Sequence, residues 1–231
     1  MTVKANVPAI RFKGFNGEWE EKKLNQIASN ISDGDWIEAE HVFESGLYRI
    51  VQTGNIGLGE WLDKANNAKY FHQKDFDELK ANEIFPGDIL ISRLAEPAGR
   101  TTILPNIGFR MVTAVDVTIV RPQSNNFDSV FFVTSMNKPQ TLKKVNESVS
   151  GTSHKRISRK NLEDITLAIP SLEEQSKIGA LFSQLDTLIT QRQSKYDKLL
   201  TLKKALLEKM FPKKGKTRSE ERRVGKECRS R

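Results

Sequence analysis

The feature that most constrains this chain is the stretch from residue 172 to 211, which contains no proline and a single glycine, Gly179. Directly before it, Pro170 closes the preceding segment, and Ser171 followed three residues later by Glu174 is typical of a capping box. These signals predict one continuous helix of roughly 60 Å at a rise of 1.5 Å per residue.

Nine positions along this helix recur at alternating spacings of three and four residues, and seven of the nine are apolar. The seven are Phe182, Leu185, Ile189, Tyr196, Leu199, Leu206 and Met210, and the other two are Arg192 and Lys203. A stripe that repeats every 3.5 residues is buried when another helix covers it. We therefore predict that the seven apolar side chains form a coiled-coil interface. The alternative is an amphipathic helix packed on its own domain, which a helix of this length would overhang.

The part of the chain before this helix has the pattern of a mainly β domain. Predicted strands, which are β-branched, alternating and bounded by Gly, Pro or Asn, are residues 46–53, 88–93, 101–104 and, as one longer strand, 109–120. Predicted short helices are residues 127–136 and 139–148, and residues 157–170 predict a helical turn capped by Ser158 and then a closing strand. Residues 20–29 fit either a strand or a short helix.

The predicted fold class is therefore α+β. A mainly β domain with short helices occupies residues 8–170, and one long coiled-coil-forming helix follows over residues 171–212. Residues 213–231 are predicted to be a basic disordered tail. Within that tail, residues 218–231 resemble the translation of a sequencing-adapter oligonucleotide, so we exclude them from the argument. The single cysteine, Cys228, lies there, which excludes an internal disulfide framework and a multi-cysteine zinc site.

The formal net charge of +8 does not lie in the domain. Residues 1–170 hold 21 basic and 21 acidic side chains, so the excess belongs to the helix and the tail. Inside the domain the two halves differ, because residues 1–96 carry a net charge of −5 and residues 97–170 carry +5. We expect any surface that faces phosphate to lie in the second half. A solvated basic face is the alternative.

Membrane and secretion signals are lacking in the sequence. No apolar run approaches the roughly 18 residues of a membrane span, and residues 1–12 have no apolar core of a signal peptide. A cytoplasmic location is the expectation.

Catalytic motifs are also lacking. The glycines of residues 54–59 are in the wrong order for a dinucleotide-binding loop, and no phosphate-binding loop of an ATPase is present. His41, His72 and His154 have no metal-ligand spacing. We predict no catalytic residues and no metal site. The alternative is a metal-dependent nuclease built on a carboxylate cluster, Asp75, Asp77 and Glu78, with Lys80 nearby, which chance also explains.

Candidates for nucleic-acid binding are more numerous. The stretch 152–161 carries four positive charges and three hydroxyls and no acid, beside a helix start, which suits contacts with phosphates. The residues selected there are Ser153, Lys155, Arg156, Arg159 and Lys160. In the loop 92–100, Arg93 and Arg100 have the paired donors that read guanine, and Gln52 or Asn55 could read adenine.

Three stretches resemble the DNA-specificity subunits of type I restriction-modification systems. Residues 8–29 (PAIRFKGFNGEWEEKKLNQIAS) look like the usual start of a target-recognition domain. Residues 52–61 (QTGNIGLGEW) and 87–100 (GDILISRLAEPAGR) resemble its central strands. Residues 150–212, with IPSLEEQ followed by a regular leucine pattern, are very similar to the passage into the family's long helix. Together they cover nearly all of residues 8–212.

The resemblance implies a non-catalytic subunit that binds double-stranded DNA sequence-specifically and directs adenine methylation and restriction by partner subunits. It implies no cofactor in this chain, with S-adenosylmethionine, ATP and Mg²⁺ used by the methyltransferase and restriction partners. Family members have two recognition domains and two antiparallel helices, whereas this chain has one of each, as a half-subunit, natural or truncated, would. Its helix would then pair with a second copy or with a second specificity half. The alternative function is a dimerising adaptor without sequence-specific DNA recognition.

Overall fold

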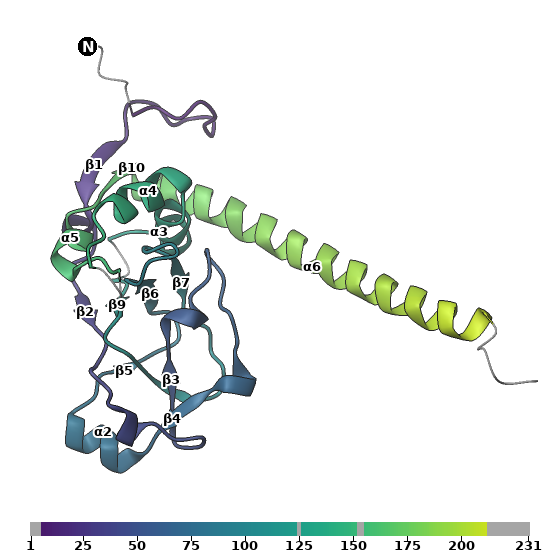
Figure 1. The fold of residues 1–231 in the computed structure, drawn as a ribbon. Coiled ribbons are helices and arrows are strands. Elements are labelled where there is room, and N and C mark those ends of the chain that lie inside the picture. Colours follow the sequence, from purple (N-terminus) through teal and green to yellow (C-terminus); the bar gives the residue numbers. More distant parts are fainter. Residues whose placement is uncertain (1–5, 124–125, 152–154, 212–231) are drawn as a thin grey trace, which may run out of the picture. The chain divides into compact units, whose positions relative to one another are not determined.

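The computed structural model describes residues 6–123, 126–151 and 155–211 (Figure 1). The chain divides into two compact units, Met1–Ser183 and Gln184–Arg231. The long helix α6, Leu172–Met210, belongs to both, because its first turns pack within the first unit. The predicted division after residue 170 thus marks the start of the helix, whereas the compact unit continues to Ser183. None of the described helices is long and apolar enough to cross a bilayer.

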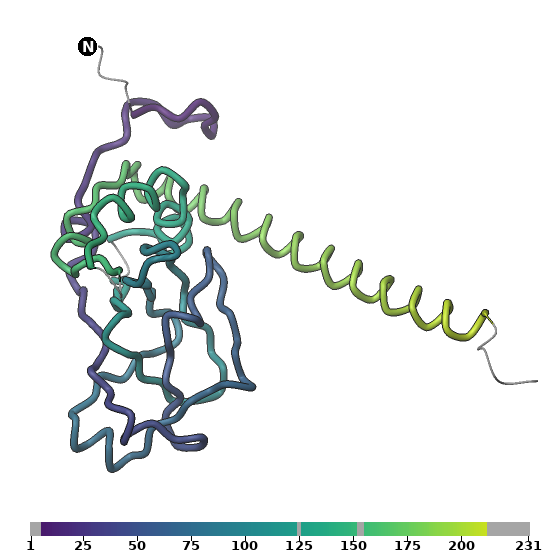
Figure 2. Tube along the Cα trace, in the orientation of Figure 1, coloured from purple at the N-terminus to yellow at the C-terminus, as the bar shows by residue number. Residues whose placement is uncertain are grey.

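Two four-stranded sheets form the frame of the first unit (Figure 1), and Figure 2 traces the path of the same chain. The first is antiparallel, and its strands in spatial order are β2 (Ile31–Asp33), β9 (Val117–Val120), β6 (Ile89–Ser92) and β7 (Thr101–Ile103). The second has the order β4 (Lys69–Phe71), β3 (Tyr48–Val51), β8 (Arg110–Thr113) and β5 (Glu83–Ile84), with β3 and β8 parallel. A two-stranded sheet pairs β1 (Glu20–Lys23) with β10 (Thr166–Ile169), so it joins the two ends of the domain.

The segment 109–120, predicted as one strand, is two strands in different sheets. β8 pairs with β3 and β5, whereas β9 pairs with β2 and β6. Between them the chain turns, and the Val117 amide donates to the Ala114 carbonyl at 3.0 Å. The prediction was wrong because Ala114 and Val115 are apolar and no Gly or Pro marks the corner where the chain changes sheets.

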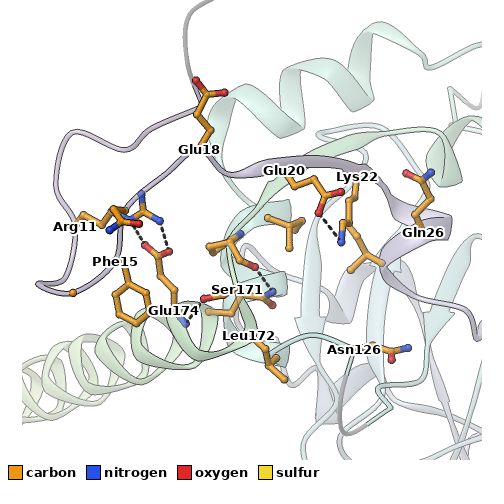
Figure 3. Close-up of a pocket in the computed structure, with 16 residues that line it drawn as sticks. Arg11, Phe15, Glu18, Glu20, Lys22, Gln26, Asn126, Ser171, Leu172 and Glu174 are labelled. Carbon is orange, nitrogen blue, oxygen red and sulfur yellow. Dashed lines mark hydrogen bonds and ion pairs between the residues drawn. The ribbon is translucent and has the colours of Figure 1, made fainter.

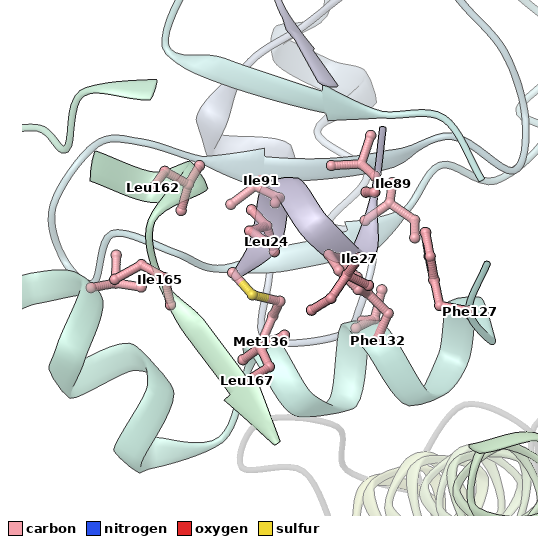
Figure 4. Packing of buried hydrophobic residues seen from close by; sticks show 14 of the residues in the cluster. Leu24, Ile27, Ile89, Ile91, Phe127, Phe132, Met136, Leu162, Ile165 and Leu167 are labelled. Carbon is pink, nitrogen blue, oxygen red and sulfur yellow. The ribbon is translucent and has the colours of Figure 1, made fainter. Parts of the chain in front are cut away.

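The main hydrophobic core lies between the first sheet and the helices. Ile89 and Ile91 of β6 pack with Leu24 of the short helix α1 (Leu24–Ile27) and with Phe132 and Met136 of α3 (Ser129–Met136) (Figure 4). The segment 20–29, which fitted either state, is therefore a strand, β1, followed by a helical turn. A separate core, built around Tyr48 and Phe71, supports the second sheet and the helix α2 (Gln73–Leu79).

Side-chain caps and a proline mark the starts of the short helices, and of the side-chain caps Ser158 was predicted. The Asp128 carboxylate accepts a hydrogen bond from the Phe131 amide at the start of α3, and Pro139 opens α4 (Pro139–Glu147). Ser158 caps α5 (Arg159–Glu163), because its hydroxyl accepts from the Asn161 amide at 3.1 Å. Three further short helical turns are η1 (Ala39–His41), η2 (Thr53–Asn55) and η3 (Ala65–Asn67).

The start of α6 is held by the N-terminal arm, residues 6–19. The Ser171 hydroxyl accepts from the Glu174 amide at 3.4 Å, as the capping box predicts. The Glu174 carboxylate, 1% exposed, accepts two hydrogen bonds from the Arg11 guanidinium, at 2.8 and 2.7 Å. The Phe15 ring lies against Lys177. A polar cleft of about 700 Å³ is bordered by Arg11, Phe15, Ser171 and Glu174 (Figure 3).

Gly179 has a packing role in the same turns. A Cβ at this position would lie 2.3 Å from the Asp128 carboxylate, so only glycine lets α6 approach the start of α3 this closely. Gln175, one turn earlier, accepts from the Asp128 amide at 3.1 Å. The one weak helix former of the long helix is thus located where the helix meets the domain.

Candidate nucleic-acid interface

The strands of the first sheet have one set of ends on the same side of the sheet, which is the side where the strands end and not the side of an outer strand. The register pairs Asp33 with Thr118, Ser92 with Val117 and Ile91 with Thr101. Hence β2 and β6 end where β9 and β7 begin. We call this side the loop edge and define it as residues 33–37, 93–100 and 114–116.

Two more segments that the sequence singled out are attached to the loop edge. The stretch from residue 155 joins it because the Ala95 amide donates to the Lys155 carbonyl at 2.9 Å and the Ile157 amide donates to the Arg93 carbonyl at 3.0 Å. The turn η2 joins it through Arg100, whose guanidinium donates to the Thr53 carbonyl at 3.5 Å. We include both segments, residues 52–55 and 155–160, in the loop edge, which therefore brings together candidate residues that are far apart in the sequence.

Three arginines of this surface are paired with acids. Arg156 lies 3.1 Å from the Asp116 carboxylate. Arg93 and Arg159 each lie 3.8 Å from the Asp33 carboxylate, and Arg159 also lies 3.2 Å from Glu163. Two loop acids, which the sequence did not single out, thus orient three arginines and reduce their net charge.

Two lysines are not compensated in this way. The side chains of Lys155 and Lys160 are exposed, and neither takes part in an ion pair with another described residue. They are the most available positive charges among the candidates. Ser153, predicted alongside them, lies outside the described residues.

Arg93 and Asn55, which were predicted to read bases, make hydrogen bonds within the domain. Arg93 is 7% exposed and donates to the Val115 carbonyl, which holds the loop edge together. Asn55 is buried, its side-chain oxygen accepts from the Gln52 amide at 3.0 Å, and its side-chain nitrogen donates to the Leu62 carbonyl at 2.9 Å. Both side chains are therefore assigned to positioning loops, because their polar atoms face the protein.

Arg100 is intermediate. It is half-buried and donates to the Glu96 carbonyl at 2.9 Å and to the Ser92 hydroxyl at 3.4 Å, which links the two ends of the loop 92–100. Its Nε is buried without a hydrogen-bond partner. Gln52 has an exposed side chain beside it. Of the four proposed base readers, Gln52 is the one that faces solvent most fully.

An exposed tryptophan on the loop edge was missed by the sequence reasoning. Trp36 follows β2 and is 69% exposed. The signal was present, because the aromatic ring stands between acidic residues, Asp35 and Glu38, in a segment without other strong patterns.

The carboxylates considered for a nuclease do not form a metal site. Asp75 accepts a hydrogen bond from the His41 ring at 2.7 Å, and Asp77 accepts from Gln73 at 2.8 Å. Within the ranges that the structure describes, no group of three or more His, Cys, Asp or Glu side chains is placed to hold a metal ion. The observed contacts are those of an ordinary surface helix.

The comparisons with known proteins address the family directly. The model of the type I restriction modification DNA specificity domain matches residues 16–206. This chain belongs to that family. Among curated relatives, the putative type I restriction enzyme MjaX specificity subunit of Methanocaldococcus jannaschii is 28% identical over 202 residues. That match covers 85% of this chain and 46% of the relative.

Solved structures show the same specificity-domain fold. The HsdS subunit of Thermoanaerobacter tengcongensis aligns with a TM-score of 0.55 at 18% identity, over 90% of this chain and 47% of that one. A chain from a study of complex assembly and conformational transition of the type I R-M system aligns with a TM-score of 0.58 at 19% identity, over 85% and 47%. The chain thus spans about half the length of these relatives.

The specificity-domain match extends far into the long helix. The seven predicted interface residues lie between Phe182 and Met210, and each is exposed, from 39% for Phe182 to 73% for Met210. Towards the end of α6, Leu199, Leu206 and Met210 border a shallow apolar groove of about 280 Å³. In the described chain this apolar stripe is therefore uncovered.

Proposed function

We propose that this chain is the sequence-specific DNA-binding unit of a type I restriction-modification complex and that it directs adenine methylation and restriction by partner subunits. The observation that carries the proposal is the loop edge, where exposed Lys155, Arg156 and Gln52 lie on two distant segments that are attached to the same side of the first sheet, with Lys160 on the helix that follows, in a member of the specificity-domain family. On this proposal the chain carries no chemistry of its own. S-adenosylmethionine, ATP and Mg²⁺ act in the methyltransferase and restriction subunits.

The side chains of the loop edge divide into two roles. Lys155 and Lys160 would neutralise phosphates, which gives affinity without sequence information. Gln52 and the outer atoms of Arg100 and Arg156 would face base edges, because these groups carry directed donors. Arg93 keeps the loops in position beneath them. Because Asp33 and Asp116 pair with arginines, the net positive charge that attracts DNA phosphates is smaller. A larger share of the binding free energy would then come from the fit of the two surfaces and from direct contacts with bases.

We further propose that the stripe of α6 is covered by the same helix of a second copy, running antiparallel. In a parallel pair in register, Arg192 would meet Arg192 and Lys203 would meet Lys203 within the seam, and like charges at facing positions oppose association. An antiparallel pair centred on Ser194 places Arg192 opposite Tyr196 of the other copy, where a cation can lie on an aromatic ring. A helix of a second specificity half could cover the stripe in the same way.

A dimerising adaptor without DNA recognition would need only the stripe on α6. Two observations favour recognition: the convergence of exposed basic and amide side chains at the loop edge, and membership of a family defined by DNA specificity.

The test is selection from randomised duplexes by the full chain together with its modification subunit, followed by methylation sequencing of cells that carry both genes. A bipartite motif should be enriched and methylated at adenine.

The Lys155→Ala/Lys160→Ala variant should weaken binding to all duplexes and reduce the slope of log affinity against log salt by about two. The matched control is Lys74→Ala/Lys143→Ala, which removes two exposed charges from α2 and α4. Absence of sequence enrichment by the unaltered chain would overturn the proposal in favour of the adaptor.

A further inference from the structure

We infer that Trp36 is a DNA-contacting residue of the loop edge and that its indole packs against apolar atoms of the duplex, such as a thymine methyl group or a sugar. The inference rests on the proposed function and adds to it a contact that does not depend on charge.

The backbone around Trp36 is fixed on both sides. The Asp35 carboxylate accepts a hydrogen bond from the Asn82 amide at 2.7 Å, and its backbone pairs with Ala114. Ile37 packs against the core of the second sheet. In extended backbone alternate side chains point to opposite sides, so anchoring Asp35 and Ile37 inward turns Trp36 outward.

The exposure of Trp36 is unlike that of the other tryptophans. Trp19 is partly buried and lies edge-on to Phe131 at 5.9 Å, and Trp61 is partly buried beneath Arg49. Trp36 exposes 69% of its surface. A large ring held in solvent by a fixed backbone loses little conformational entropy on binding, which is what makes such rings effective contact residues.

The arginines near Trp36 favour nucleic acid as its binding partner. Asp33, three residues before it, lies 3.8 Å from both Arg93 and Arg159, and three residues of extended chain span roughly 10 Å, so the Trp36 backbone lies on the same side of the sheet as these cations. Its neighbour Asp35 pairs with Ala114, two residues before Asp116, which holds Arg156. A polyanion bound at the loop edge would therefore reach Trp36, and in the grooves thymine methyl groups and sugars provide the apolar surface that the indole needs.

The experiment measures affinity of the full chain with its modification subunit for the duplex that the unaltered chain selects, over a series of salt concentrations. Trp36→Ala should lower affinity about tenfold at every salt concentration and leave the salt slope unchanged, because the lost contact releases no counterions. Trp36→Phe should keep most of the affinity. Tryptophan fluorescence should be quenched on DNA binding by the unaltered chain, and this change should shrink strongly in Trp36→Phe.

The matched control is Phe85→Ala. Phe85 is 51% exposed, its amide donates to Asp88, and its ring lies 5.9 Å from the guanidinium of Arg121, which follows the end of β9 that pairs with Ile89 and not the end at the loop edge. It should not change affinity. Thermal unfolding of each variant separates loss of contact from loss of fold.

The outcomes separate the two proposals. Sequence-enriched binding that is equal in the unaltered chain and in folded Trp36→Ala overturns the inference and leaves the proposed function in place. No enrichment by the unaltered chain overturns the proposed function. If Trp36→Ala loses the modification subunit but binds the duplex as before, the indole contacts protein, and the inference is wrong.

Discussion

Burial decides what each basic residue of the loop edge can do. Arg93 has the same guanidinium as Arg156, but Arg93 is enclosed and bonded to the chain, whereas Arg156 reaches solvent with one acidic neighbour. Composition cannot distinguish the buried arginine from the exposed one, because their different contacts are made by Val115 and Asp116. These two residues approach the arginines only when the chain turns from β8 into β9. The sequence thus predicted candidate residues without separating those whose polar atoms face the protein from those that face solvent.

Away from the loop edge, one pair of residues predicts a pH dependence of stability. The pKa of His41 is raised above its ordinary value of 6.5, first by its hydrogen bond to Asp75, and the same bond lowers the pKa of Asp75 below 3.8. The His41 contribution is present below pH 6.5 and is lost as pH rises through the raised pKa. The Asp75 contribution is present above pH 3.8 and is lost as pH falls through the lowered pKa.

Asp75→Asn should therefore lower the free energy of unfolding more at about pH 5.5 than at about pH 9. Glu40 at 3.6 Å from the His41 ring and Glu78 also favour protonated His41, and His72 lies 3.8 Å from Asp75, so the dependence belongs to the cluster. Urea titrations at both pH values measure it. Asp77→Asn on the same helix is the control, since Asp77 pairs with Gln73 and no histidine. An equal loss from Asp75→Asn at both pH values would contradict the assignment.

For helices and strands, the sequence predictions were correct where a local pattern, such as apolar alternation or a cap, agrees with how the segment packs in the folded domain. Strands β3, β6, β7 and β10, helices α3 and α4 and the long helix α6 were expected from alternation, caps and breakers, and all are present. The short strands β2, β4 and β5 were not predicted, because a strand of two to three residues is fixed by its partners and carries almost no pattern of its own. The corner between β8 and β9 was missed for the same reason, because no local sequence pattern marks it. The helix α2 was not predicted either.

The exposed stripe of α6 leads to a prediction for this element. Ile189 is at the middle of the stripe and 65% exposed, so Ile189→Asp removes little packing from the described chain. It would place an unpaired charge in a helix pair, and we expect self-association to weaken about a hundredfold. Sedimentation of the chain alone over a concentration series measures this.

Ser194→Asp, which introduces the same charge away from the stripe, serves as the control. A chain that sediments as a monomer at all concentrations, or that associates equally well with aspartate at position 189, would show that a second copy does not cover the stripe.

For the whole molecule, the proposed pairing of two identical copies has a consequence for the DNA site. Two-fold symmetry presents the same loop edge twice, so the methylated motif should consist of two inverted copies of one half-site with a fixed spacer. Methylation sequencing of cells with this gene and its modification partner reads the motif directly. A substitution at Gln52 should then change both halves alike. A motif with two unrelated halves would mean that a different recognition domain occupies the second position.

The contact between Arg11 and Glu174 limits where this chain could be joined to a related one without damage to the compact unit. The arm and the first turns of α6 come from opposite ends of the recognition domain in sequence, yet a buried ion pair and the glycine at 179 make them one packed body that closes by Ser183. A recombination breakpoint inside this body would separate the carboxylate from its arginine. A breakpoint after Ser183 would instead transfer the whole compact unit with its ion pair intact. Recombination between related genes should therefore leave its junctions in the exposed part of α6.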